Sequence, residues 1–176
     1  MQMSTNYIVT IKAEDRPGLL HLVTGVLNRK LIPIISLNAA PTDIHDIVLI
    51  TMKIEISEKA LQPLLYKLEN IIEVFAVEAI SAAKASCLRA AYFKLDRAVL
   101  DTPVKDAIQK YGAVIVNIYP DALLVSKYGS KVAIRQLYSE LEGPHLLGFS
   151  QTGLIADSGL IGNSVEDQSS VISLAA

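Results

Sequence analysis

The stretch from Asp15 to Leu20, DRPGLL, contains residue types that can recognise a small molecule. Pro17 fixes its own φ and favours extended geometry at Arg16, and Gly18 lets another group approach the backbone closely. The Asp15 carboxylate can hold an ammonium group, and free N–H groups at the start of a following helix can receive a carboxylate. The turn is therefore a candidate site for a free amino acid.

A second interpretation of the same turn needs no ligand. Asp15 can cap the N-terminus of the helix, with Pro17 in its first turn and Gly18 present for packing. The local physical chemistry does not decide between a ligand turn and a plain helix start.

No other part of the sequence carries a recognisable catalytic or metal-binding motif. It has no GxGxxG, Walker loop or GxSxG, and His21, His45 and His145 form no HxH or HxxxH pair. Cys87 is the only cysteine, which excludes an internal disulfide and a CxxC metal site. We therefore predict no catalytic residues and no metal site in this chain.

The composition limits the class of protein further. The 176 residues suffice for one ordinary domain or two small ones, and 51% of them are hydrophobic, enough to build a core. A net charge of −2 gives no electrostatic reason to expect nucleic acid. Met1 to Tyr7 is polar, and no apolar run approaches the roughly 20 residues that span a bilayer. We expect a cytoplasmic protein without membrane contact.

Hydrophobic periodicity predicts the elements that position the turn. Residues alternate between two faces in the predicted strands, and apolar residues recur at three- and four-residue steps in the predicted helices. In the first half, the pattern predicts strands at Tyr7–Ala13, Ile32–Ala39, Asp46–Ile56 and Ile71–Ile80, and helices beginning at Leu19 and after Ser57. The order is β-α-β-β-α-β, with DRPGLL between the first strand and the first helix.

The second half repeats this order. The pattern predicts strands at Cys87–Leu95, Ala113–Tyr119, Ala122–Tyr128 and Leu146–Ile155, and helices at Thr102–Tyr111 and Ser130–Leu141. We therefore predict an α+β protein of two tandem ferredoxin-like βαββαβ sandwiches. The expected divisions are a first domain at 1–80, a linker at 81–86, a second domain at 87–157 and a flexible tail at 158–176.

Several stretches of the sequence resemble one known family. Within this element order, DRPGLLHLVTGVLNRK resembles the ACT domain, a sensing module that commonly binds amino acids. ISLNAAPTDIHDIVLITMKIEI and LLYKLENIIEVFAVEAI are similar to the first domain of the small regulatory subunit of acetohydroxyacid synthase, also called acetolactate synthase. The second half, with its turn VNIYPDALLV, is similar to the C-terminal domain of that subunit. The resemblance covers about Tyr7 to Ser158.

The resemblance implies a regulatory subunit that has no chemistry of its own. Such a subunit binds a catalytic subunit that carries thiamine diphosphate, Mg2+ and FAD, raises its activity, and mediates feedback inhibition by valine or another branched-chain amino acid. The chain itself is expected to hold no cofactor. We also expect a homodimer, because a small sandwich leaves apolar surface and a strand edge uncovered.

The same resemblance implies an effector site with two parts. The first part is the turn and the start of the helix, and the second strand completes the site across a dimer interface. The implied effector-binding residues are Asp15, Pro17, Gly18, Leu19 and Leu20 in the first part, and Pro33, Ile34, Ile35 and Ala40 in the second.

Two of these positions depart from the family pattern. Family members typically carry Asn-Ile-Glu-Ser in the second strand, whereas this chain has Pro33-Ile34-Ile35-Ser36. Proline supplies neither the side-chain amide nor a backbone N–H. Asp15 also stands where many relatives have Asn, which changes the charge that faces a ligand. These departures predict an altered effector or the loss of feedback binding.

An alternative function is a free-standing tandem ACT-like amino-acid sensor that regulates a different enzyme or partner. An enzyme in its own right is disfavoured by the missing catalytic constellation. Co-purification with a large thiamine-dependent synthase distinguishes the regulatory subunit from the free-standing sensor.

Overall fold

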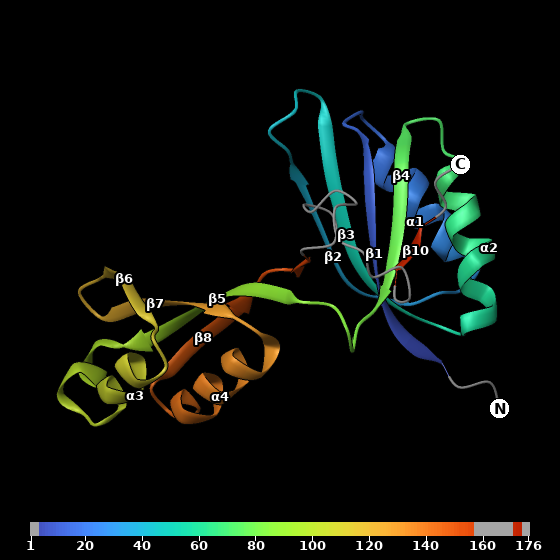
Figure 1. Cartoon of the computed structure of the whole chain (residues 1–176). Coiled ribbons are helices and arrows are strands. Elements are labelled where there is room, and N and C mark those ends of the chain that lie inside the picture. Colours follow the sequence, from blue (N-terminus) through green and yellow to red (C-terminus); the bar gives the residue numbers. More distant parts are fainter. Residues whose placement is uncertain (1–3, 157–170, 174–176) are drawn as a thin grey trace. The chain divides into compact units, whose positions relative to one another are not determined.

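The computed structural model describes residues 4–156 and 171–173 and divides the chain into two compact units. One unit contains Met1–Ser86 and Leu154–Ala176, and the other contains Cys87–Gly153. Each unit combines an antiparallel sheet with α-helices packed on one of its faces (Figure 1).

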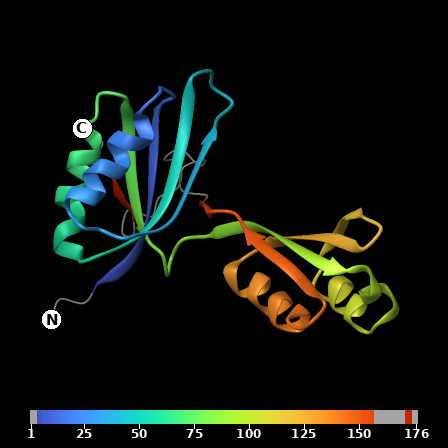
Figure 2. The same ribbon diagram turned by 180° about the vertical axis from the view of Figure 1, so that it is seen from behind.

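The first unit is built around β1, the central strand of its sheet. Its elements are β1 (Thr5–Glu14), α1 (Leu19–Arg29), β2 (Ile34–Pro41), β3 (Ile47–Ile56), α2 (Glu58–Glu69), β4 (Val74–Ser81) and β10 (Val171–Ser173). The strand order is β10-β4-β1-β3-β2, so β2 lies at one edge of the sheet. Both α1 and α2 cover the same face of this sheet (Figure 2).

Alternation along the strands gives this sheet two different faces. Val9 and Ile11 of β1 are fully buried in the core cluster formed with the two helices. Thr10, between them, lies on the face without helices. It belongs to a polar row of register partners that runs across four strands and consists of Asn38, Thr51, Thr10 and Glu78.

The two helices of the first unit form because one stripe of each is apolar. The buried residues of α1 are Leu19, Val23, Val26 and Leu27, and those of α2 are Leu61, Leu64, Leu65 and Leu68. Ser57 lies at the N-cap position of α2, but its side chain makes no capping hydrogen bond. Among the described residues, no helix is long and apolar enough to cross a membrane.

The second unit has the same element order as the first. Its elements are β5 (Cys87–Asp96), the 3-10 helix η1 (Arg97–Asp101), α3 (Val104–Lys110), β6 (Val114–Ile118), β7 (Ala122–Gly129), α4 (Lys131–Leu141) and β8 (Leu146–Gln151). The strands have the order β6-β7-β5-β8. Phe93 of β5 is fully buried in the core, and its ring centroid lies 5.0 Å from that of Phe149 in β8. The βαββαβ repeat expected from periodicity is confirmed.

Some elements of the second unit begin or end at other residues than the sequence predicts. The helix expected from Thr102 begins at Val104, because η1 precedes it. The Asp96 carboxylate accepts a hydrogen bond from the Ala98 N–H at 2.8 Å, a local side-chain contact that starts η1. The strand expected at Leu146–Ile155 ends at Gln151, and Ile155 belongs to a separate short strand, β9 (Ile155–Ala156).

Part of the segment expected to be a flexible tail is a strand. Val171–Ser173 forms β10, which pairs antiparallel with β4 in the register Val171↔Ile80, Ile172↔Ala79 and Ser173↔Glu78. The rest of that segment, 158–170 and 174–176, lies outside the described residues. The compact units therefore group the C-terminal residues with the first unit, and the division of the sequence into domains stays a prediction.

Candidate functional site

The turn between β1 and α1 is held by backbone hydrogen bonds from two other loops. The Glu14 N–H donates to the Glu73 carbonyl, and the Asp15 N–H donates to the Asp46 carbonyl, both at 2.8 Å. Glu73 directly precedes β4, and Asp46 directly precedes β3. The position of the turn is therefore fixed by two neighbouring loops, which precede β3 and β4.

Gly18 adopts a conformation in this turn that favours glycine. Its φ is +93°, in the left-handed region, where a Cβ atom is strained. A Cβ atom built on Gly18 would have no heavy atom within 4 Å. Backbone conformation, and not packing within this chain, explains a glycine at this position, and the space beside it is open.

The N-terminus of α1 has no side-chain cap. Gly18 occupies the N-cap position, and no side chain, including that of Asp15, accepts a capping hydrogen bond. The Leu19 N–H donates to the Arg16 carbonyl at 3.1 Å, but the N–H groups of Leu20 and His21 make no hydrogen bond to any described residue. These amides and the helix dipole favour an anion at this end of α1.

A hollow of about 310 Å³ opens beside this helix end. It is lined by Asp15, Arg16, Gly18, Leu19, Leu20, His21, Ala39, Val48 and Ile50, and we call it the turn hollow. Leu19, Val48 and Ile50 are buried core residues, so they give it an apolar floor. Asp15, Arg16 and His21 add polar groups to its lining. The turn hollow thus combines one carboxylate, one guanidinium and free amides with an aliphatic surface.

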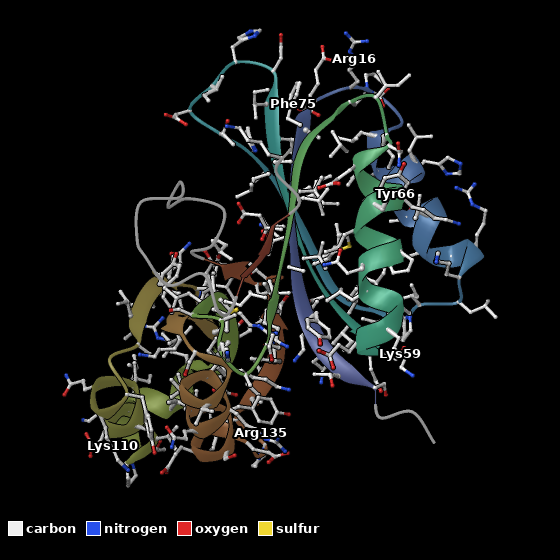
Figure 3. All side chains as sticks on the ribbon, turned by 45° about the vertical axis from the view of Figure 1, so that its right-hand side comes forward. Arg16, Lys59, Tyr66, Phe75, Lys110 and Arg135 are labelled. Carbon is white, nitrogen blue, oxygen red and sulfur yellow. The ribbon has the colours of Figure 1, made fainter. Side chains whose placement is uncertain are left out.

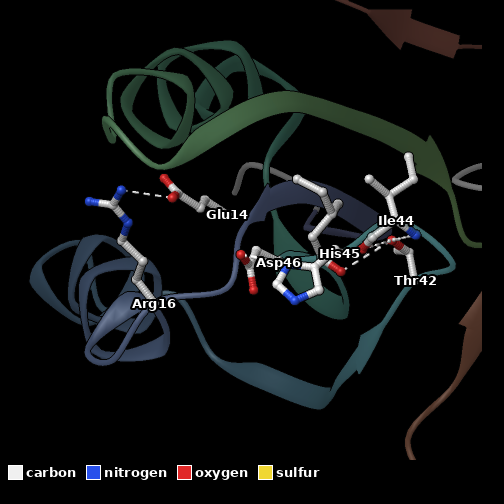
Figure 4. Close-up of polar contacts among 7 residues, drawn as sticks. Glu14, Arg16, Thr42, Ile44, His45 and Asp46 are labelled. Carbon is white, nitrogen blue, oxygen red and sulfur yellow. Dashed lines mark hydrogen bonds and ion pairs between the residues drawn. The ribbon is translucent and has the colours of Figure 1, made fainter.

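The loops around the turn hollow contain an ion pair, a histidine–carboxylate contact and a side-chain turn (Figure 4). Arg16 Nη2 lies 2.7 Å from Glu14 Oε1, and His45 Nδ1 lies 2.7 Å from Asp46 Oδ2. The Thr42 hydroxyl accepts a hydrogen bond from the Ile44 N–H at 3.2 Å, which folds the loop between β2 and β3. Arg16 and Phe75 lie at one end of the first unit, and Lys59 lies at the other (Figure 3).

The structure brings together four of the nine predicted site residues. Asp15, Gly18, Leu19 and Leu20 line the turn hollow. The other five do not line it: Pro17, Pro33, Ile34, Ile35 and Ala40. Pro33, Ile34 and Ile35 are exposed at the start of the edge strand β2. In the predicted dimer, these residues would complete the effector site of a second copy. An effector-binding role stays a prediction for all nine.

Ala39, and not Ala40, lies in the turn hollow. Ala39 is the register partner of the buried Ile50, and Ala40 is the partner of Leu49, so the two alanines point to opposite faces of the sheet. Arg16, His21, Val48 and Ile50 also line the turn hollow, although the sequence did not predict them as effector-binding residues. Ile50 lies two residues after Val48 on the same buried face of β3, so strand alternation is the signal that could have found both.

The second unit has a hollow of its own, of about 410 Å³, beside the turn between β6 and β7. It is lined by Lys94, Tyr119, Pro120, Asp121, Ala122 and Leu124. Arg97 anchors this turn, because its Nη1 donates to the Pro120 carbonyl at 3.3 Å. No helix N-terminus opens into this hollow, unlike the turn hollow.

Two titratable groups of the described residues have shifted pKa values, and neither lies in the turn hollow. Partial burial raises the pKa of Glu78. The hydrogen bond with Tyr111 and the nearby Glu140 carboxylate raise the pKa of Lys110. Among the described residues, no group of three or more His, Cys, Asp or Glu side chains is placed to hold a metal ion.

The curated proteins that this chain matches in sequence are acetolactate synthase small subunits. No protein-family model matches the chain. Over 151 residues, it is 21% identical to the acetolactate synthase small subunit of Mycobacterium bovis, a match that covers 85% of this chain and 90% of the relative. The putative acetolactate synthase small subunit of Mycobacterium tuberculosis matches with the same identity and coverage.

The fold also matches a solved structure. The crystal structure of the acetolactate synthase small subunit from Thermotoga maritima matches with a TM-score of 0.79 and 13% identity, over 86% of this chain and 95% of that chain. This likeness establishes the tandem α+β fold expected from the sequence. The sequence matches confirm the resemblance: the chain is similar to acetolactate synthase small subunits along most of its length.

Proposed function

We propose that this chain is the regulatory subunit of an acetolactate synthase and that it binds a branched-chain amino acid, such as valine, in the turn hollow. The similarity to acetolactate synthase small subunits along 85% of the chain supports the regulatory role. The choice of ligand is supported by the turn hollow, because its lining offers a binding group for each part of an aliphatic amino acid.

The three parts of the ligand have separate partners. The free N–H groups of Leu20 and His21 donate to the ligand carboxylate, and Arg16 supplies a positive charge beside them. The Asp15 carboxylate accepts the ligand ammonium group. The aliphatic side chain of the ligand lies on the apolar floor, which Val48 and Ile50 help to form. The Asp15 carboxylate attracts the ammonium group with a full negative charge, whereas the amide of an Asn at this position would offer only a dipole.

The partner in this proposal is the large catalytic subunit, which carries the thiamine diphosphate, Mg2+ and FAD of the holoenzyme. This chain raises the activity of that subunit and transmits feedback inhibition from the turn hollow, and it acts as a homodimer in the cytoplasm. It contributes no catalytic residue, so the chain alone forms no acetolactate from pyruvate.

Two measurements test the proposal. Isothermal titration calorimetry with l-valine, l-leucine and l-isoleucine should give saturable binding to the purified chain. Adding the chain to its catalytic subunit should raise acetolactate formation, and the bound amino acid should lower it again. Amino-acid binding without any effect on the synthase, and without co-purification, would instead support the free-standing sensor. Turnover of pyruvate by the chain alone, with thiamine diphosphate and Mg2+ added, would contradict a non-catalytic role.

A further inference from the structure

The wall of the turn hollow on β2 is formed by a single methyl group, that of Ala39. Ala39 lies on the helix-covered face of β2, where its register partner is the fully buried Ile50. Leu37, two residues earlier on the same face, packs its larger side chain against the core. Ala39 is exposed and is the residue of β2 that lines the turn hollow.

The part of the lining that belongs to the turn also contains a small residue. Gly18 has no side chain, and the space where its Cβ would lie has no heavy atom within 4 Å. The turn hollow of about 310 Å³ stays open because the two residues at its walls, Gly18 and Ala39, are small.

The two small residues differ in what they govern. Gly18 lies beside the free amides of α1, where the charged groups of an amino acid would bind. Ala39 lies next to Ile50, on the apolar part of the lining. The residue at position 39 therefore limits the volume available to the ligand side chain. The turn supplies the contacts with the ligand carboxylate.

We propose that Ala39 determines which amino acid the turn hollow accepts, by limiting the size of the aliphatic side chain that fits on the floor. This inference rests on the proposed function, since it concerns the same site. With alanine at this position, the floor takes a branched aliphatic side chain. A larger residue at position 39 occupies that volume and leaves room only for a smaller ligand side chain.

The selectivity of the turn hollow between ligands of different size tests the proposed role of Ala39. One methylene in an apolar pocket changes affinity by about 10-fold or more. In Ala39→Leu, we expect affinity for l-leucine and l-valine to fall by at least about 10-fold, and affinity for l-alanine to fall much less. Ala39→Val should give an intermediate change. The ratio of the affinities for l-leucine and l-alanine, measured by calorimetry, is the readout.

Ala76→Leu is the matched control. Ala76 is an exposed residue of β4 on the other face of the same sheet, paired with Lys12, and it does not line the turn hollow. It should leave all three affinities unchanged. Because Ala39 is exposed, Ala39→Leu adds bulk without disturbing the core, and circular dichroism melts of both variants check that they fold.

The outcomes separate the two proposals. If wild type binds branched-chain amino acids and Ala39→Leu binds the three ligands with unchanged affinities, the size limit is wrong and the proposed function stands. An equal loss of all three ligands in folded Ala39→Leu also contradicts the size limit, since the site is then closed without selectivity. If wild type binds no amino acid, both proposals are wrong.

Discussion

The guanidinium of Arg16 lies 2.7 Å from the carboxylate of Glu14, two residues earlier in the chain. Their side chains are partly exposed, and an ion pair of this kind contributes only about 0–1 kcal/mol to stability. A guanidinium has five N–H donors, and the Glu14 carboxylate occupies only part of them. The ion pair therefore holds Arg16 beside the turn hollow and leaves donors free for a ligand carboxylate.

We predict that Arg16→Gln weakens the binding of l-valine by about 3- to 10-fold, because a charge-assisted contact is lost at a partly exposed site. The free energy of unfolding should change by less than about 1 kcal/mol. Calorimetry and urea denaturation measure the two effects. Arg29→Gln, at the other end of α1, is the control and should leave binding unchanged. A similar loss in both variants would remove Arg16 from the site.

Gly18→Asp and Gly18→Ala separate charge from backbone strain. Each should lower the free energy of unfolding by about 1 kcal/mol, since φ is +93° at this position. Only Gly18→Asp places a carboxylate beside the free amides of α1. We predict that Gly18→Asp abolishes amino-acid binding and feedback inhibition, and that activation of the catalytic subunit survives.

Calorimetry on both variants, with inhibition assays on the reconstituted enzyme, measures this difference. Gly25→Ala is the control, because Gly25 lies within α1 and a Cβ atom there has open space. It should leave binding unchanged. Equal binding by wild type and Gly18→Asp would mean that DRPGLL is only a helix start. Equal losses in Gly18→Ala and Gly18→Asp would assign the effect to strain and not to charge.

We predict a homodimer at micromolar concentration that pairs through the β2 edge. Ile35 is half exposed on this strand, at an irregularity of its register with β3. A lysine on an edge strand opposes pairing with a second strand. Ile35→Lys should therefore shift sedimentation from dimer to monomer. Ile72→Lys, in the exposed loop before β4, should remain dimeric. A wild-type monomer throughout this concentration range would contradict the prediction.

Glu78 predicts a small pH dependence of stability. Partial burial raises its pKa in the folded state, so the folded chain binds the proton more tightly than the unfolded chain does. The stability that protonated Glu78 contributes is fully present below its pKa in the unfolded chain. It is lost as pH rises through its raised pKa in the folded chain. Glu78→Gln should thus be more stable than wild type at neutral pH, by no more than about 0.5 kcal/mol, because the carboxylate keeps part of its solvent.

Urea denaturation of Glu78→Gln and wild type across the acidic range measures this difference. It should vanish at low pH, where the wild-type carboxylate is protonated in both the folded and the unfolded state. Glu55→Gln, an exposed position on β3, is the control and should show no such trend. A wild type that gains stability relative to Glu78→Gln as pH rises would reverse the predicted sign.

Periodicity predicted most elements of the fold, because burial on one face leaves a regular mark in the sequence. The alternation of Val9 and Ile11 marks β1, and the spacing of Leu19, Val23 and Val26 marks α1. The contact between β10 and β4 leaves no such mark. This pairing joins residues far apart in the sequence, and a three-residue strand is too short for a local pattern to indicate its partner.

The candidate site was predictable only in part. The turn from Asp15 to Gly18 could be identified because proline and glycine restrict the local backbone. The choice between Ala39 and Ala40 could not, because the register of β2 with β3 shifts between Ile34 and Ser36. One extra residue at such a shift reverses which side chains face the helices, and tertiary pairing alone decides it.

The partly covered sheet of the first unit has a consequence for how far copies of this chain can assemble. Along Glu78–Ile80, β10 occupies the edge of β4, whereas β2 has no strand beyond it in the described part of the chain. Two copies that join β2 to β2 occupy each other's β2 edge, so growth through that edge terminates at a closed pair. Stripping β10 from β4 would expose a second edge, and the same pairing could then propagate into open-ended fibres.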